Sequence, residues 1–126
     1  MTNKYLEVLK SEFTIHRFNA SDKIPYEVYK SKFYWIGKTD EELSIVCKSN
    51  LLNNKNNSVS NWTIIRIAAK LDFSVVGVLA EISNALKDAG ISVIALSTYD
   101  TDYIMLKTAK LNEAKIALEN IGYEFI

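Results

Sequence analysis

The clearest pattern lies in the second half of the chain, where short apolar runs alternate with amphipathic stretches. The apolar runs are rich in β-branched residues, which predicts strands at 63–68, 91–96, 103–106 and 123–126. In the two stretches between them, apolar residues recur three and four positions apart, which predicts helices over 75–89 and 111–121. The resulting order, βαββαβ, is that of the ferredoxin-like α+β fold, in which both helices cover one face of an antiparallel sheet.

Both predicted helices carry end signals. Asp72 or Ser74 is the expected N-cap of the first helix, because a short side-chain oxygen can accept a hydrogen bond from a free amide of the first turn. Gly90 and Gly122 follow the two amphipathic stretches, and glycine commonly ends a helix at that position.

The first half of the chain repeats the start of this order. Residues 6–18 predict a long strand that changes face before Lys10, and Pro25 opens a short helix with Tyr26, Val28 and Tyr29 on its apolar face. The apolar runs 33–36 and 43–47 predict a hairpin. The asparagine-rich segment 49–61 then predicts a loop where a second helix and a fourth strand would belong. We therefore expect a degenerate unit at 1–49, a linker at 50–61 and a complete ferredoxin-like unit at 62–126.

Composition and charge narrow the possible functions. The 126 residues are 48% hydrophobic and 24% charged, which is typical of a globular protein. The charges of the fifteen basic and fifteen acidic residues cancel. The chain therefore lacks the excess of positive charge that is typical of proteins that bind nucleic acids. No apolar run approaches the roughly 20 residues that span a bilayer, and the N-terminus lacks the apolar core of a signal peptide. A single cysteine fits a reducing compartment, so we expect a cytoplasmic protein without a membrane partner.

Two residue types with reactive side chains occur once each. His16 has no second histidine or cysteine at metal-ligand spacing, so we interpret it as a residue on a strand face and expect no metal and no cofactor. Cys47 ends an apolar strand, and we expect a small buried hydrophobe whose thiol pKa is raised by burial.

The strongest candidate site is the hexapeptide from Ser97 to Asp102, which separates two apolar strands and carries a hydroxyl or carboxylate at every position. Such a dense polar cluster exceeds what a hairpin turn needs. The fold brings it near the start of the first helix, where free amides favour a carboxylate and Gly77 in the first turn lets a ligand approach the backbone. An anion site beside Asp100 and Asp102 suits a zwitterion, and we expect Asp102 to have no protein partner. The alternative is that Gly77 only permits close helix packing.

Catalysis is a weaker interpretation of the same segment. Two aspartates one residue apart after an apolar strand occur as nucleophile and acid in aspartyl phosphotransferases. Those enzymes also need a parallel sheet and distant basic and acidic residues, whereas this pattern implies antiparallel pairing. A calcium loop, a phosphate loop and a nucleophile elbow are absent from the sequence. We expect no enzymatic activity.

Four segments, 42–47, 71–79, 90–92 and 97–103, resemble the tandem ACT-domain proteins related to the cytosolic arginine sensors called CASTOR. ACT domains are ferredoxin-like modules that bind amino acids at domain or subunit interfaces. The resemblance implies a non-catalytic regulatory module, and it implies that Asp102 pairs with the ammonium of the ligand. The ligand contacts that it implies are Ser74, Val76, Gly77, Thr98, Tyr99 and Asp102.

Two functions stay open at this stage. The first is a regulatory module that binds a small molecule, an amino acid by the resemblance. The second is a ligand-free interaction module that self-associates through its sheet edges or helices. In either case we expect a homodimer, because an ACT-type sheet leaves an edge strand that a second copy can cover. The aromatic strand 33–36 is the expected contact.

Overall fold

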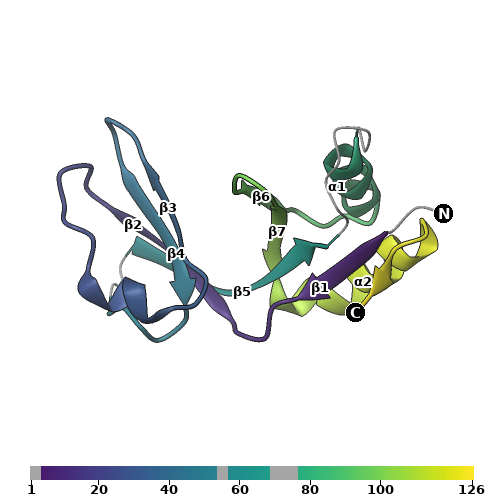
Figure 1. The fold of residues 1–126 in the computed structure, drawn as a ribbon, viewed down its shortest axis with the longest axis horizontal. Helices are drawn as coiled ribbons and strands as arrows, with labels where there is room; N and C mark the ends of the chain where they lie inside the picture. The colour runs from purple at the N-terminus through teal and green to yellow at the C-terminus, as the bar shows by residue number, and fades with distance from the viewer. Residues whose placement is uncertain (1–3, 54–56, 69–76) are drawn as a thin grey trace. The chain divides into compact units, whose positions relative to one another are not determined.

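The computed structural model describes residues 4–53, 57–68 and 77–126 and divides the chain into two compact units. The N-terminal unit is formed by Ser11–Trp62, and the C-terminal unit by Met1–Lys10 together with Thr63–Ile126 (Figure 1). The predicted division into a degenerate unit (1–49), a linker (50–61) and a complete unit (62–126) stays a prediction. No helix among the described residues is long and apolar enough to cross a membrane.

The C-terminal unit follows the predicted order and has the ferredoxin-like α+β fold. Its strands and helices are β1 (Tyr5–Val8), β5 (Ser58–Ile67, of which the residues from Thr63 belong here), α1 (Val78–Asp88), β6 (Ile94–Ser97), β7 (Asp102–Lys107), α2 (Leu111–Asn120) and β8 (Glu124–Phe125). A 3₁₀ turn, Thr108–Lys110, leads into α2. Strand β7 pairs with both β5 and β6, as the fold requires.

Strand β1 is inserted between β5 and β8, which the sequence pattern did not indicate. It runs antiparallel to β5, with Leu6 opposite Ile67, and parallel to β8, with Leu6 opposite Phe125 (Figure 1). The single strand predicted over 6–18 is therefore two strands, of which β1 belongs to the C-terminal unit and the second, Phe13–Phe18, to the N-terminal unit. The change of face before Lys10 marks the break between them.

One apolar core joins the sheet of the C-terminal unit to its helices. Ile65 and Ile67 occupy alternate positions of β5, as do Ile104 and Leu106 in β7, so each pair points to one face of the sheet. Both helices contribute to the same core, which confirms that they cover one face. Burying an isoleucine or leucine side chain fully is worth about 1.5–3 kcal/mol, so this core is the main source of stability. Its helical members are Ile82, Leu86, Ala114 and Leu118.

A small polar network fixes the start of β1. Lys4 Nζ lies 3.2 Å from Glu81 Oε1 in α1, and the Tyr123 hydroxyl donates to Glu81 Oε2 at 2.9 Å. The hydrogen bond from Tyr123 is the largest cause of the lowered pKa of Glu81, and burial raises the pKa of Tyr123. The pair between Lys4 and Glu81 is partly exposed, so it contributes less to stability than the core.

Both helices end in the same hydrogen-bond motif, which confirms the two predicted glycine ends. At the end of α1 the Ile91 amide donates to the Leu86 carbonyl at 2.8 Å, and the Gly90 amide donates to Lys87 at 2.9 Å. These two bonds define a Schellman motif, which needs a left-handed residue. Gly90 supplies it with φ 76°, and Gly122 does the same after α2 with φ 99°.

The start of α1 differs from the prediction. The helix begins at Val78, and Gly77 is its N-cap with φ 86° and no capping side chain. Because that φ is left-handed, Gly77 precedes the first turn, and the prediction that it lies inside the turn is wrong. Asp72 and Ser74, the predicted caps, lie outside the described residues.

The N-terminal unit contains β2 (Phe13–Phe18), the 3₁₀ helix η1 (Tyr26–Lys30), β3 (Trp35–Lys38) and β4 (Leu43–Lys48). Its sheet has the order β3, β4, β2 and then the first part of β5, where Ser58 lies opposite His16. A fourth strand is thus present inside the segment whose composition predicted a loop. Between β4 and β5, the described residues form no long helix.

A bulge interrupts the pairing of β2 with β5. Phe13 lies opposite Trp62 and Ile15 opposite Val59, so β5 contains one residue more than β2 over this stretch. Asn61 has φ 68°, a left-handed conformation that asparagine adopts more readily than most residues. The bulge therefore falls where β5 leaves the N-terminal unit.

The short helix η1 covers less of the sheet than predicted. Val28 is fully buried and packs against Leu43, Ile45 and Cys47 of β4. Tyr26 and Tyr29, which the pattern placed on the apolar face, are 74% and 52% exposed. A five-residue 3₁₀ helix can direct few side chains to one face, because its turn repeats every three residues.

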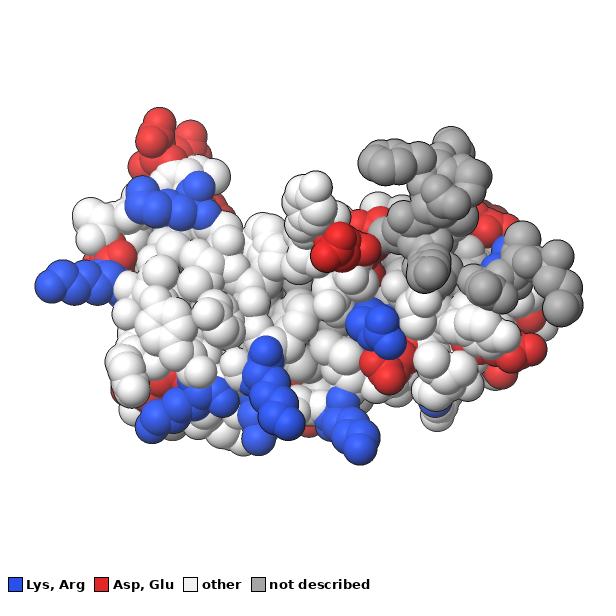
Figure 2. Space-filling model, viewed as in Figure 1, with Lys and Arg blue, Asp and Glu red and all other residues white. Residues whose placement is uncertain are grey.

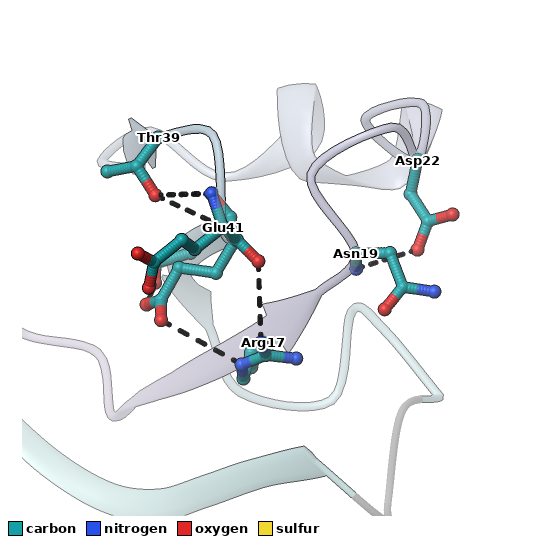
Figure 3. A network of polar contacts seen from close by, with 7 residues as sticks. Arg17, Asn19, Asp22, Thr39 and Glu41 are labelled. Carbon is teal, nitrogen blue, oxygen red and sulfur yellow. Dashed lines mark hydrogen bonds and ion pairs between the residues drawn. The ribbon is translucent and has the colours of Figure 1, made fainter.

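Polar contacts tie the end of β2 to the turn between β3 and β4 (Figure 3). Arg17 Nη2 donates to the Glu41 carbonyl at 3.5 Å, and Arg17 Nε lies 3.8 Å from Glu42 Oε2. Within the turn, Thr39 Oγ1 accepts from the Glu41 amide at 3.2 Å. These contacts are exposed, so they shape the turn more than they stabilise the fold.

The left-handed glycine after α1 gives a direct test of this fold. A Cβ at Gly90 would meet no heavy atom within 4 Å, so the backbone conformation alone opposes a side chain. We expect Gly90→Ala to lower the free energy of unfolding by about 1–2 kcal/mol, and Gly90→Asn to lower it less. Urea unfolding measures both variants, with an unchanged slope as the sign that the fold is kept. Equal stability of Gly90→Ala and the wild type would contradict the motif.

Candidate functional site

The segment from Ser97 to Asp102 forms a tight hairpin turn between β6 and β7. Ser97 lies opposite Asp102 in the register of the two strands. Next, the Thr98 amide and hydroxyl both donate to the Thr101 carbonyl, at 2.8 and 3.2 Å. Two residues remain at the tip, and the side chain of one of them, Tyr99, is fully exposed. The predicted hairpin is confirmed.

Asp102 differs from the expectation of a carboxylate without a protein partner. The Ser97 hydroxyl donates a hydrogen bond to Asp102 Oδ1 at 2.5 Å. That expectation is wrong, because the two residues are cross-strand neighbours. The hydrogen bond holds one carboxylate oxygen in place, and the second oxygen can still accept a bond from another group.

Gly77 lies at the N-terminal end of α1, where the first amides of the helix have no partner within the helix. A Cβ placed on Gly77 would meet nothing within 4 Å. Among the described residues no packing contact requires a glycine here, and its φ of 86° is a backbone conformation that favours glycine. The space beside it is open to a ligand as far as the described residues show.

The predicted site residues are placed only in part. Thr98, Tyr99 and Asp102 share one hairpin, and Gly77 lies at the start of α1. Ser74 and Val76 lie outside the described residues. The proximity of the hairpin to the start of α1 stays a prediction.

The sequence did not indicate a polar pocket in the N-terminal unit. Its volume is about 370 Å³, and it lies between the sheet and the segment that follows β4. The hydroxyl of Thr14 is hydrogen-bonded to those of Ser49 and Ser60, at 2.8 and 3.2 Å. The residues that line the pocket are Thr14, His16, Asn50, Leu51, Leu52, Asn53, Ser58 and Ser60.

His16 is the most unusual residue of this pocket. It is 3% exposed, and its Nδ1 atom has no hydrogen-bond partner among the residues that the structure describes. Burial lowers the pKa of the imidazole below 6.5, which favours the neutral ring. The ring stacks on Phe18, with centroids 6.1 Å apart. The prediction that His16 lies on a strand face is confirmed. No signal in the sequence indicated that His16 lies opposite Ser58 in a pocket.

Cys47 behaves as predicted. It is fully buried beside Val28 and Ile45, and burial raises the pKa of its thiol from 9.0 to about 11. Within the described parts of the chain, no three histidine, cysteine or acidic residues are grouped as a metal site would require.

Charged side chains of both signs are mixed on the surface. In each unit, the face drawn in Figure 2 carries Lys or Arg beside Asp or Glu, and neither sign covers it alone. This agrees with the formal net charge of zero.

A family model described as the ACT domain matches residues 57–120. The chain belongs to the ACT-domain family. A second model, described as an N-terminal domain, matches residues 11–62, the same residues as the N-terminal unit. No curated protein matches the chain significantly.

Solved structures with this ACT-type fold cover nearly the whole chain. A protein from Agobacterium tumefaciens is 26% identical with a TM-score of 0.91, over 97% of this chain and 91% of its own. A Vibrio cholerae protein of unknown function, described as a possible transport protein, is 19% identical with a TM-score of 0.72, over 92% and 88%. The ligand-free regulatory subunit of aspartate kinase from Thermus thermophilus is 10% identical with a TM-score of 0.66, over 93% and 97%. The last two likenesses are of fold alone.

The burial of Cys47 predicts slow reaction with thiol reagents. At pH 8 a thiol with a pKa of about 11 is about one part in a thousand thiolate, which is the reactive form. We expect the native ACT protein to react with Ellman's reagent at least tenfold more slowly than the urea-unfolded chain. Equally fast labelling of both forms would contradict the burial.

Proposed function

We propose that this chain is a non-catalytic regulatory module that binds an amino acid, related to the CASTOR-type arginine sensors. The match of residues 57–120 to the ACT domain carries the proposal, because ACT domains bind small molecules such as amino acids and often dimerise. The likeness to an aspartate kinase regulatory subunit supports a regulatory fold. We assign the protein to the cytoplasm, where its single thiol stays reduced.

The proposed site combines the β6–β7 turn with the start of α1. Free amides at the N-terminus of a helix attract a carboxylate, and Gly77 leaves them open. Asp102 would accept the ligand's ammonium while Ser97 keeps the carboxylate oriented. The exposed ring of Tyr99 is free to close over the ligand. The proposed contacts are Ser74, Val76, Gly77, Thr98, Tyr99 and Asp102.

We also propose that the N-terminal unit is a degenerate ACT-like module. Its elements β2, η1, β3 and β4 occupy the first four places of the βαββαβ order, with a 3₁₀ helix in place of the first α-helix.

A homodimer is the proposed assembly. Strand β3 is an edge of the N-terminal sheet and pairs only with β4 among the described strands, so a second chain could pair with its outer side. Beside it, Tyr29 stacks edge-on against both Tyr26 and Tyr34, with centroids 6.3 and 5.6 Å apart. All three rings are at least 40% exposed, and tyrosine is enriched at protein interfaces. The same surface supports the second function, self-association without a ligand.

The amino-acid site is tested with the Asp102→Asn variant. A panel of the twenty amino acids first identifies the ligand by thermal shift, since a ligand at a hundred times its Kd stabilises by about 2.7 kcal/mol. Asparagine can keep the hydrogen bond from Ser97 but loses the charge. We expect ligand affinity to fall about ten- to a hundredfold, because a hydrogen bond between charged groups is worth about 1.5–3 kcal/mol. Calorimetry measures the affinity.

Asp100→Asn is the matched control for this test, because Asp100 lies at the tip of the same turn. We expect it to change affinity less than Asp102→Asn. Unchanged affinity in Asp102→Asn, or no thermal shift with any amino acid, would sink the amino-acid assignment.

The dimer is tested by light scattering at micromolar concentration. We expect the mass of two chains for the wild type. Tyr29→Ser together with Tyr34→Ser removes two exposed rings without touching a core and should shift the protein toward the monomer. A wild-type monomer at that concentration would contradict the proposed assembly.

A further inference from the structure

The N-terminal sheet has a face that is divided between apolar and polar residues. Residues directly opposite each other in antiparallel strands point to the same side. Phe18 lies opposite Leu43, and His16 lies opposite both Ile45 and Ser58. On this face, the side chains of β4 belong to the apolar core that contains Val28. The side chains of β2 and β5 on the same face are largely polar.

The polar half of this face lies where a complete ACT fold carries its second helix. In the C-terminal unit the corresponding face is apolar and α2 packs on it through Ala114 and Leu118. In the N-terminal unit, the described residues between β4 and β5 include no long helix, and the pocket of about 370 Å³ occupies this side. Small-molecule sites commonly enclose about 300–1,000 Å³.

The polar groups in this pocket are not all satisfied by the protein. The hydroxyls of Thr14 and Ser60 bind each other. In contrast, Nδ1 of His16 is buried and has no hydrogen-bond partner among the described residues. A buried polar atom without a hydrogen bond destabilises a fold, so most such atoms have a partner. A neutral imidazole offers one donor and one acceptor nitrogen. His16 therefore lines the pocket with a ring that has one nitrogen whose hydrogen-bonding capacity the described residues leave unused.

The lining also indicates the charge of such a ligand. It consists of hydroxyls, amides, an imidazole and the two leucines Leu51 and Leu52, with no Asp, Glu, Lys or Arg among the described lining residues. Hydroxyls and amides both donate and accept hydrogen bonds, but they do not balance a full charge that has been taken out of water. Burial lowers the pKa of His16, which favours the uncharged form of the imidazole.

We propose that this pocket is a second binding site, for an uncharged small molecule with several hydrogen-bonding groups. It is separate from the amino-acid site, since none of its lining residues belongs to the ACT-domain hairpin or to α1. A polyol or sugar and a nucleobase or carboxamide share this chemistry, and the apolar wall from Leu51 and Leu52 would pack against the less polar side of either.

The single histidine of the chain makes the test direct, because its ring gives one set of NMR signals. The probes are myo-inositol, ribose, uracil, adenine and nicotinamide, with glutamate and arginine as charged comparisons. We expect at least one uncharged probe to bind and to shift the ring ¹⁵N resonances of His16. Sugars and polyols form one arm of the panel, and nucleobases and nicotinamide form the other.

Two variants decide whether binding occurs in the pocket. Ser58→Ala removes one lining hydroxyl and should weaken the binding probe about tenfold, and His16→Leu should abolish binding while leaving the melting temperature equal or higher. Asp102→Asn is the control and should leave binding of this probe unchanged, which separates the site from the proposed amino-acid site. If no uncharged probe shifts the His16 signals, or if Ser58→Ala and His16→Leu both bind as the wild type does, the proposal is wrong. A response to glutamate or arginine alone would also overturn it.

Discussion

The backbone pairing of a single strand, β5, is the constraint on which both units depend. Over its ten residues, the first part pairs with β2 and the second part pairs with β1 and β7. A shift of β5 by one residue would turn its side chains to the opposite face, and Ile65 and Ile67 would leave the core of the C-terminal unit. Near Asn61 a bulge adds one residue to β5 against β2, and an extra residue in a strand shifts which side chains face each side of the sheet.

Much of the C-terminal unit was predictable because its elements are regular and strongly periodic. The apolar faces of α1 and α2 and the glycines that end them, Gly90 and Gly122, all appear in the sequence as local signals. The insertion of β1 was not predictable, because pairing between residues near opposite ends of the chain leaves no local pattern. Strand β5 was predicted too short, because Ser58 and Ser60 face a polar pocket and so lack the apolar alternation of a buried strand.

The candidate sites also show that only features formed by contiguous residues could be predicted from the sequence. The polar residues of the β6–β7 turn stand out in the sequence because they are contiguous. The pocket of the N-terminal unit is assembled from three separate segments, represented by Thr14, Asn50 and Ser58, and each looks ordinary alone. His16 was correctly placed on a strand, but its burial and its unpartnered nitrogen follow from strand register. Register between distant strands, like the insertion of β1, is a property that the sequence pattern could not supply.

The insertion of β1 between β5 and β8 has a consequence for the order of folding. Tyr5 pairs with Glu124, so the contact joins two of the most distant described residues of the chain. Contacts with such sequence separation form slowly, because a long loop must close before they add stability. During synthesis β1 emerges early and has no parallel partner until β8 has been made. The N-terminal unit, whose strands all lie between residues 13 and 62, needs no such delay and can form first.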